Sequence, residues 1–105
     1  MGMQKGSAMR FEYDPNKSAS NKAKHGVDFE EAQALWEDPY IVVIDAVNSD
    51  EPRSAWIGVM AGRHWTAITT NRGGAIRIIS VRRSHKAEEA LYERDKDDQR
   101  GGVRP

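Results

Sequence analysis

The sequence predicts an α+β domain in which an antiparallel sheet is accompanied by helices at the start and the end of the chain, in the order β-α-α-β-β-β-β-α. Three observations support this prediction. Helix-capping residues mark two segments between residues 14 and 38, four β-type segments joined by short turns fill residues 40–83, and another helical segment follows. Because the helical segments do not alternate with the strands, a parallel doubly wound sheet is disfavoured.

The first strand and the first helix are predicted within residues 9–25. Residues 9–13 alternate between apolar and polar side chains, which is typical of a short strand. Asp14 suits the N-cap of a helix, and Pro15 suits its first position. We expect the helix to end at His25, where Gly26 can adopt the left-handed conformation of a C-cap. His25 therefore has a structural interpretation as well as a catalytic one.

The second helix is predicted to begin at Asp28 and to end at Asp38. Asp28 and Glu31, three residues apart, form the pattern of a capping box. Pro39 disfavours helical conformation at the residue before it, so the helix should stop there. Four apolar residues share one face at helical spacing and are expected to pack against the sheet: Phe29, Ala32, Leu35 and Trp36.

Four strands are predicted after this helix, and their short connections favour an antiparallel meander. The first of them, residues 40–46, is almost continuously apolar, as expected of a buried strand. The others are predicted at residues 53–61, 65–70 and 75–83. Ser84 is a suitable N-cap for the last helix, which should continue to about Lys96.

One domain is expected at residues 9–96, preceded at residues 1–8 by a disordered segment or a cloning remnant, and followed at residues 97–105 by a disordered tail. The 105 residues include no cysteine, which excludes a disulfide framework, a thiolate nucleophile and a zinc site built on cysteine. No apolar run approaches the roughly 20 residues of a membrane helix, and no secretion signal is apparent. We therefore expect a cytoplasmic protein that does not bind membranes.

The strand predicted at residues 75–83 carries arginines among β-branched residues. Arginine is costly to bury without a partner. Period-two alternation places Arg77 and Arg83 on one face of this strand and Arg82 on the other. A rigid strand that presents guanidinium groups is suited to binding phosphate. The alternative is that these arginines pair with carboxylates elsewhere in the fold.

The net charge is zero, but charge is segregated along the chain. Residues 27–52 contain eight carboxylates and no lysine or arginine, whereas residues 53–87 contain seven lysines and arginines, two histidines and no carboxylate. Such a basic segment can attract an anionic substrate or an acidic protein partner, or it can pair with the acidic segment inside one fold. The charge pattern does not distinguish these three explanations.

Three ordered motifs carry a family resemblance: Phe11-Glu12-Tyr13-Asp14 followed by Lys17, Asn21, Lys24-His25-Gly26-Val27, Phe29 and Glu31-Ala32; then Asp38-Pro39; then Arg77-Ile78-Ile79-Ser80-Val81-Arg82-Arg83 followed by Glu88, Tyr92 and Glu93. Together they resemble the BrnT family of bacterial type II toxins, over about residues 9–93. The resemblance implies a fold similar to that of the RelE-like ribonuclease toxins. It also implies a toxin that cleaves RNA and is neutralised by a BrnA antitoxin, which is a ribbon-helix-helix protein.

On this interpretation we predict a metal-independent endoribonuclease that inhibits translation and needs no cofactor. The basic segment lacks the clustered carboxylates of a two-metal nuclease. The resemblance further implies that toxin and antitoxin together repress their own operon, so DNA is contacted only through that complex.

The predicted catalytic residues could clamp a phosphate or transfer a proton, and they are Lys24, His25, Arg77, Arg83 and Tyr92. Further RNA contacts are predicted at Arg63, Arg72, Arg82 and Lys86. The alternative hypothesis is a non-catalytic binding module whose basic face docks an acidic protein or a nucleic acid. Turnover of RNA in the presence of EDTA distinguishes the two.

Overall fold

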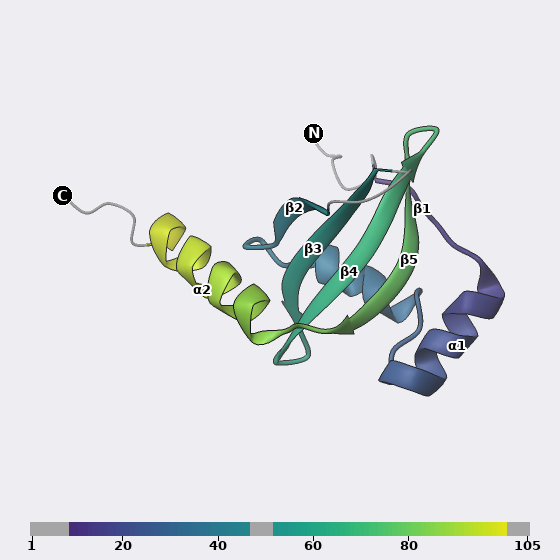
Figure 1. Ribbon diagram of the computed structural model, residues 1–105, viewed down its shortest axis with the longest axis horizontal. Coiled ribbons are helices and arrows are strands. Elements are labelled where there is room, and N and C mark those ends of the chain that lie inside the picture. The colour runs from purple at the N-terminus through teal and green to yellow at the C-terminus, as the bar shows by residue number, and fades with distance from the viewer. Residues whose placement is uncertain (1–8, 47–51, 101–105) are drawn as a thin grey trace.

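Five strands form one mixed sheet in the computed structural model, which describes residues 9–46 and 52–100 (Figure 1). The sheet order is β1-β5-β4-β3-β2, with the bounds Phe11–Glu12 (β1), Val42–Ala46 (β2), Arg53–Met60 (β3), Arg63–Arg72 (β4) and Ala75–Arg83 (β5). The helices are α1 (Pro15–His25), the 3₁₀ helix η2 (Glu31–Glu37) and α2 (Lys86–Arg100). This order confirms the predicted α+β class with helices at both ends.

The predicted antiparallel meander is confirmed for β2 to β5, which pair with one another in sequence order. The first strand departs from that pattern because β1 pairs with β5 in parallel, with Phe11 opposite Ile76 and Glu12 opposite Arg77. No tight turn joins β1 to β5, so nothing forces these two strands to run antiparallel. The sheet is therefore mixed.

The predicted ends of α1 are confirmed. Asp14 lies at the N-cap, where its Oδ1 accepts a hydrogen bond from the amide of Asn16 at 2.8 Å. Gly26 lies at the C-cap with a φ of 87°, and its amide donates to the carbonyl of Lys22 at 2.9 Å. A residue with a Cβ is strained at this φ, so glycine ends the helix directly after His25.

The second helix is shorter and tighter than predicted. Asp28 and Glu31 form the expected capping box, since each side chain accepts from the other's amide, at 2.8 and 2.9 Å. However, η2 begins only at Glu31 and is a 3₁₀ helix, in which Asp38 donates to the carbonyl of Leu35. The capping box and Pro39 confine the helix to seven residues, which is nevertheless long for a 3₁₀ segment. The predicted apolar face is buried at Phe29, Ala32 and Leu35, and Trp36 packs beside it.

The prediction that the strand at residues 40–46 is buried is wrong. Val43 and Ile44 of β2 are 48% and 39% exposed. In the described sheet β2 is the edge strand and pairs only with β3. The apolar run in the sequence therefore predicted the strand correctly but its burial incorrectly, because hydropathy does not report the position of a strand within its sheet.

The last helix begins later and extends further than predicted. It starts at Lys86 rather than after Ser84, whose hydroxyl is hydrogen-bonded to that of Thr66 at 2.8 Å. It continues to Arg100, so residues 97–100, predicted as part of a disordered tail, are helical. The predicted segment 1–8 and the rest of the predicted tail, residues 101–105, lie outside the described residues.

A β-bulge interrupts the regular alternation of β5. Ile68 of β4 lies opposite Ser80, but the next residue, Thr69, lies opposite Ile78. Ile79 is thus an extra residue without a partner on β4. Side chains that precede the bulge point to the face opposite to that expected from simple alternation.

The bulge changes the predicted relation between the arginines. Arg83 lies opposite Trp65, and Arg77 lies opposite Thr70. Trp65 and Thr70 are five residues apart on β4, so these two side chains point to opposite faces. Directly opposed residues share a face, so Arg83 and Arg77 also point to opposite faces. The prediction that Arg77 and Arg83 share a face is therefore wrong. Arg77 instead shares its face with Arg82.

The hydrophobic core lies between the sheet and η2. Its buried residues are Val27, Phe29, Ala32, Leu35, Trp65, Ala67, Ile78 and Val81. In Figure 1, η2 lies behind the strands, α1 lies beside β5, and α2 leaves the sheet on the opposite side. No helix of the described chain crosses in front of the centre of β4 and β5 in this view. Side chains cover this face as well, because Thr66 and Ile57, which point away from η2, are fully buried.

Candidate nucleic-acid interface

The face of the sheet away from η2 carries two of the predicted arginines. Arg82 lies opposite Thr66 and Arg77 opposite Thr70, so both point to the side away from η2, together with Ser80. Their side chains are 26% and 28% exposed. Five residues separate them along β5, a span of roughly 16 Å at the rise of a strand. The two guanidinium groups can therefore contact different phosphates of one RNA strand.

A third arginine on this face was missed in the sequence. Ser54 lies opposite Thr69, which brings Arg53 level with Thr70 and across β4 from Arg77. Arg53 is partly exposed. In the sequence, Arg53 alternates with Ala55 and Ile57, which indicates that these three side chains share a face of the strand. Only the register of the sheet shows that Arg77 points to the same face. We call the side chains Arg53, Arg77, Ser80 and Arg82 the arginine face.

Carboxylates hold Arg77 and Arg82 in place. Glu12 accepts from Arg77 Nη1 at 3.1 Å, a consequence of the pairing of β1 with β5. Glu88 of α2 accepts from both terminal nitrogens of Arg82, at 2.8 and 3.0 Å. A guanidinium group has five N–H donors, so each arginine keeps donors for a further ligand.

Glu88 is the centre of a network that joins α2 to the sheet. It also accepts from the Thr66 hydroxyl at 3.0 Å and from the His85 amide at 2.7 Å. The hydrogen bonds from Arg82 and from these groups outweigh burial and lower the pKa of Glu88 to about 2. The carboxylate in turn raises the pKa of the Arg82 guanidinium. Arg82 is therefore fixed in orientation before any ligand binds.

Lys24 and His25 lie at the edge of the arginine face. Both belong to the last turn of α1 and line a hollow of about 200 Å³ together with Ser80 and the bulge residue Ile79. Asn21 holds α1 there: its amide donates to the carbonyls of Val27 and Val81, both at 2.9 Å, and accepts from the Val81 amide at 3.2 Å. Asn21 thus satisfies the backbone hydrogen-bonding groups of Val81, at the edge of β5 beyond the end of β1.

Arg83 lies on the other side of the sheet. Its guanidinium carbon is 5.7 Å from the centre of the Trp65 ring, which faces the core under η2. Arg63 at the β3–β4 turn and Lys86 at the start of α2 are exposed near this end of the sheet, and Arg72 is exposed at the β4–β5 turn. By alternation along β4, Arg63 points to the same side as Arg83, whereas Arg72 points to the side of the arginine face.

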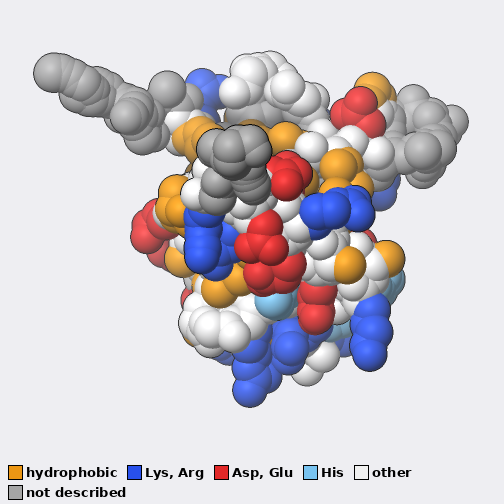
Figure 2. Space-filling model, turned by 90° about the vertical axis from the view of Figure 1, so that its left-hand side faces the viewer, with side chains coloured by type: hydrophobic (Ala, Val, Ile, Leu, Met, Phe, Trp, Pro, Cys, Tyr) orange, Lys and Arg blue, Asp and Glu red, His pale blue; other side chains and the backbone are white. Residues whose placement is uncertain are grey.

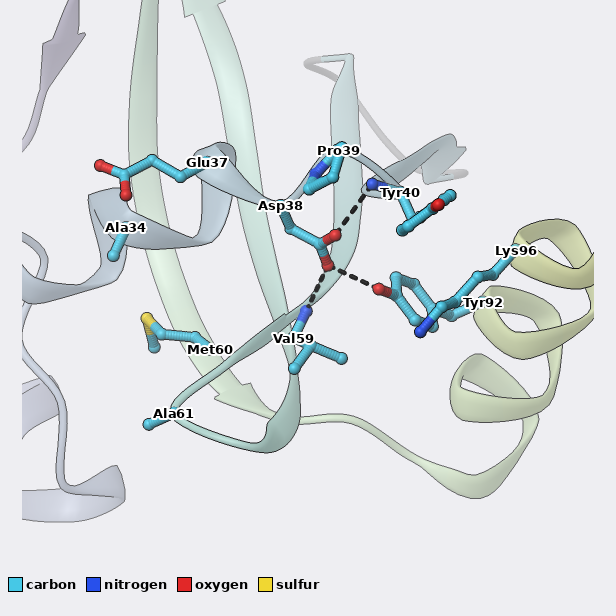
Figure 3. Close-up of a pocket in the computed structure, with 10 residues that line it drawn as sticks. All are labelled: Ala34, Glu37, Asp38, Pro39, Tyr40, Val59, Met60, Ala61, Tyr92 and Lys96. Carbon is cyan, nitrogen blue, oxygen red and sulfur yellow. Dashed lines mark hydrogen bonds between the residues drawn. The ribbon is translucent and has the colours of Figure 1, made fainter. Parts of the chain in front are cut away.

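Tyr92 is 1% exposed and does not belong to the arginine face. Figure 3 shows its hydroxyl directed at Asp38, to which it donates at 2.7 Å, while the amides of Tyr40 and Val59 donate to the same carboxylate. Burial and the bond to Asp38 raise the pKa of Tyr92. Burial opposes the charge of Asp38, but these three hydrogen bonds lower its pKa. The pair fastens α2 to the end of η2.

A second group that the sequence predictions omitted is the pair formed by His64 and Glu93. His64 Nε2 is 2.7 Å from Glu93 Oε2. Glu93 belongs to the third sequence motif, as do Glu88 and Tyr92, and the structure shows that all three contact the sheet or η2 from α2. The third motif could have indicated Glu93, but no feature of the sequence connected Glu93 with His64.

The acidic and basic segments do not neutralise each other. Among the described residues, the ion pairs of the basic segment join Arg77 to Glu12, Arg82 to Glu88, His64 to Glu93 and His85 to Glu88, and none of these carboxylates lies in residues 27–52. Figure 2, which is viewed from the side of α2, shows lysine and arginine side chains along the lower edge of the molecule and acidic side chains above them, flanked by further basic side chains. Within the described residues, pairing between the acidic and basic segments is therefore not supported. The alternative that the strand arginines pair with carboxylates elsewhere in the fold is confirmed for Arg77 and Arg82.

The described residues contain no group of three or more histidine, aspartate or glutamate side chains placed to hold a metal ion. No helix among them is long and apolar enough to cross a membrane.

The fold and this site define a class: small α+β proteins that present basic side chains on one face of a largely antiparallel sheet. Residues 13–88 match the profile of the family described as "Ribonuclease toxin, BrnT, of type II toxin-antitoxin system". The chain belongs to this family, which confirms the predicted resemblance. The matched segment includes Lys24, His25 and the whole arginine face. No relative was found among curated proteins.

Proposed function

We propose that this protein is a metal-independent endoribonuclease toxin and that it binds its RNA across the arginine face. The observation that carries the proposal is the placement of Arg77 and Arg82 on one face of the sheet, each fixed by a carboxylate and each still partly exposed. Membership of a ribonuclease toxin family supports RNA as the substrate. Side chains held by such neighbours lose little freedom when a phosphate binds.

The reaction is the attack of a ribose 2′-hydroxyl on the adjacent phosphorus. The O2′–P bond forms, the P–O5′ bond breaks, and the products are a 2′,3′-cyclic phosphate and a 5′-hydroxyl. The transition state carries additional negative charge, which Arg82 and Arg77 are placed to stabilise. The two carboxylates nearest these arginines, Glu12 and Glu88, are each bonded to a guanidinium group, which makes them poor ligands for a divalent cation.

The remaining predicted residues take different roles in this proposal. Lys24 and His25, beside Ser80, contact the RNA at the edge of β5, where His25 can also exchange a proton with it. Arg63, Arg72 and Lys86 contribute attraction at the ends of the face. Arg83 and Tyr92 support the sheet and α2 rather than touching the RNA.

The partner in this proposal is a BrnA-like ribbon-helix-helix antitoxin that covers the arginine face. The complex binds operator DNA through the antitoxin, and the free toxin degrades RNA in the cytoplasm and so stops translation. The basic character of the face supports an acidic contact surface on the antitoxin, because complementary charge raises the rate of association.

Incubation of the purified protein with single-stranded RNA in EDTA tests the proposal. We expect fragments with 2′,3′-cyclic phosphate ends, and no cleavage of an oligonucleotide that has 2′-deoxyribose throughout. The R82A variant, purified in the same way, should lose activity, which excludes a contaminating ribonuclease. Cleavage only with added magnesium or manganese would contradict the metal-independent mechanism. Tight binding without cleavage would favour the non-catalytic binding module.

A further inference from the structure

His64 lies on the same face of the sheet as Arg82. Its position on β4 is two residues before Thr66, which lies opposite Arg82, so His64 and Arg82 are diagonal neighbours. Diagonal neighbours on one face have Cα atoms roughly 7–8 Å apart, which long side chains can bridge. A phosphate bound by Arg82 is therefore within reach of the His64 ring.

The His64 ring is oriented by two contacts. Its Nε2 is 2.7 Å from Glu93 Oε2, and its plane meets the Tyr92 ring edge-on, with 5.3 Å between the ring centres. The backbone is fixed as well, because the His64 carbonyl accepts from the Ser84 amide at 3.1 Å. The side chain nevertheless remains 23% exposed. This combination of a held ring and partial exposure suits a group that acts on a ligand.

The bond to Glu93 determines which ring nitrogen is available. An ionised carboxylate only accepts hydrogen bonds, so His64 Nε2 carries a proton and donates it to Glu93. In the neutral ring the lone pair then resides on Nδ1. Among the described residues, no group is hydrogen-bonded to Nδ1. The neighbouring titratable and charged groups are Glu93 and Tyr92 from α2, Glu88 from the same helix, and Arg82 from β5.

We infer that His64 is the general base of the RNA cleavage and that Glu93 is its positioning residue. This inference rests on the proposed function. Nδ1 removes the proton of the 2′-hydroxyl while O2′ bonds to phosphorus and the P–O5′ bond breaks. The leaving O5′ takes a proton from water, and the His64 imidazolium returns its proton to water, so the ring is restored.

Three variants test this assignment. H64Q should cleave RNA at least about 100-fold more slowly, which is the lower range of general acid–base catalysis. It should bind a 2′-deoxy oligonucleotide, which cannot be cleaved, as the wild type does. E93Q should be slowed less and should show an altered pH–rate profile. The matched control is H85Q, because the His85 side chain is 69% exposed and its ring lies 3.9 Å from Glu88, beyond hydrogen-bond distance. The substitution keeps the His85 amide that donates to Glu88.

A measurement on the wild-type side chain keeps the test valid if H64Q fails to fold. The chain has three histidines, so NMR spectra of H25Q and H85Q assign the remaining ring signals to His64. We expect the 2′-deoxy oligonucleotide to shift the His64 signals. Unshifted signals, or wild-type cleavage rates for a folded H64Q, would overturn the inference. A wild-type protein that cleaves no RNA would instead reject the proposed function itself.

Discussion

Substitution of Arg77 by alanine tests whether RNA lies on the arginine face, and Arg83 provides the matched control. Both are arginines of β5, but the bulge places them on opposite faces. R77A removes a half-exposed ion pair with Glu12, which contributes about 0–1 kcal/mol to stability. R83A removes a cation–π contact with Trp65, worth about 0.5–1 kcal/mol at an exposed site. Both variants should therefore fold.

The expected effect on RNA differs much more than the effect on stability. A hydrogen bond to a charged group contributes about 1.5–3 kcal/mol, so the loss of the Arg77 contact should weaken binding by about 10- to 150-fold. The loss of one phosphate contact should also reduce the slope of log K against log salt by about 0.7 for a single strand. R83A should change affinity by less than about threefold, because its charge lies on the far face.

The assay is the binding of a 2′-deoxy oligonucleotide at several salt concentrations, together with RNA cleavage by each variant. Thermal unfolding of both variants provides the control for folding. Equal losses in R77A and R83A would refute the argument, because they would mean that the charge of the whole domain matters and not the face. A loss in R83A alone would place the RNA on the side of η2.

Three further predictions concern the support of the site and its partner. N21L should lower the free energy of unfolding by about 3–5 kcal/mol, because it removes three buried hydrogen bonds and leaves backbone groups of β5 unsatisfied. Chemical denaturation measures this free energy, and a decrease below about 1 kcal/mol would contradict the prediction. Glu88 has a lowered pKa, so its contact with Arg82 should stabilise the fold fully above pH 4.5 and progressively less as the pH falls toward 2. Wild type and E88Q should accordingly differ in stability at pH 7 and converge near pH 2, and a constant difference would argue against this linkage. Finally, R77E should weaken binding of the antitoxin, whereas R83E should leave it nearly unchanged, as measured by pull-downs at two salt concentrations. Weaker binding by R83E than by R77E would place the antitoxin on the other face.

Much of the fold could be predicted because its signals are local. Asp14, Gly26 and the pair of Asp28 and Glu31 act within a few residues of themselves, and each forms the cap that its residue type and spacing predicted. The bounds of β5 were also predicted correctly at residues 75–83, from β-branched residues behind a glycine turn. Capping and turn chemistry depend on neighbouring backbone groups, which the sequence states directly.

The candidate site could be predicted only in part, because its residues meet through the register of the sheet. Residue types and family motifs indicated Lys24, His25, Arg77 and Arg82, and these lie on or beside the arginine face. The same reasoning missed Arg53 and misplaced Arg83.

The sequence by itself determined the class of the fold, the order of the elements, the caps of the helices and the family, because these depend on local propensities and ordered motifs. Tertiary structure alone decided which side chains face the same way. One extra residue, Ile79, moves Arg77 to the face of Arg82, and the docking of α2 joins His64 to Glu93 across 29 residues. A strand's side chains alternate with a period of two, so a single-residue shift in pairing reverses every side chain beyond it.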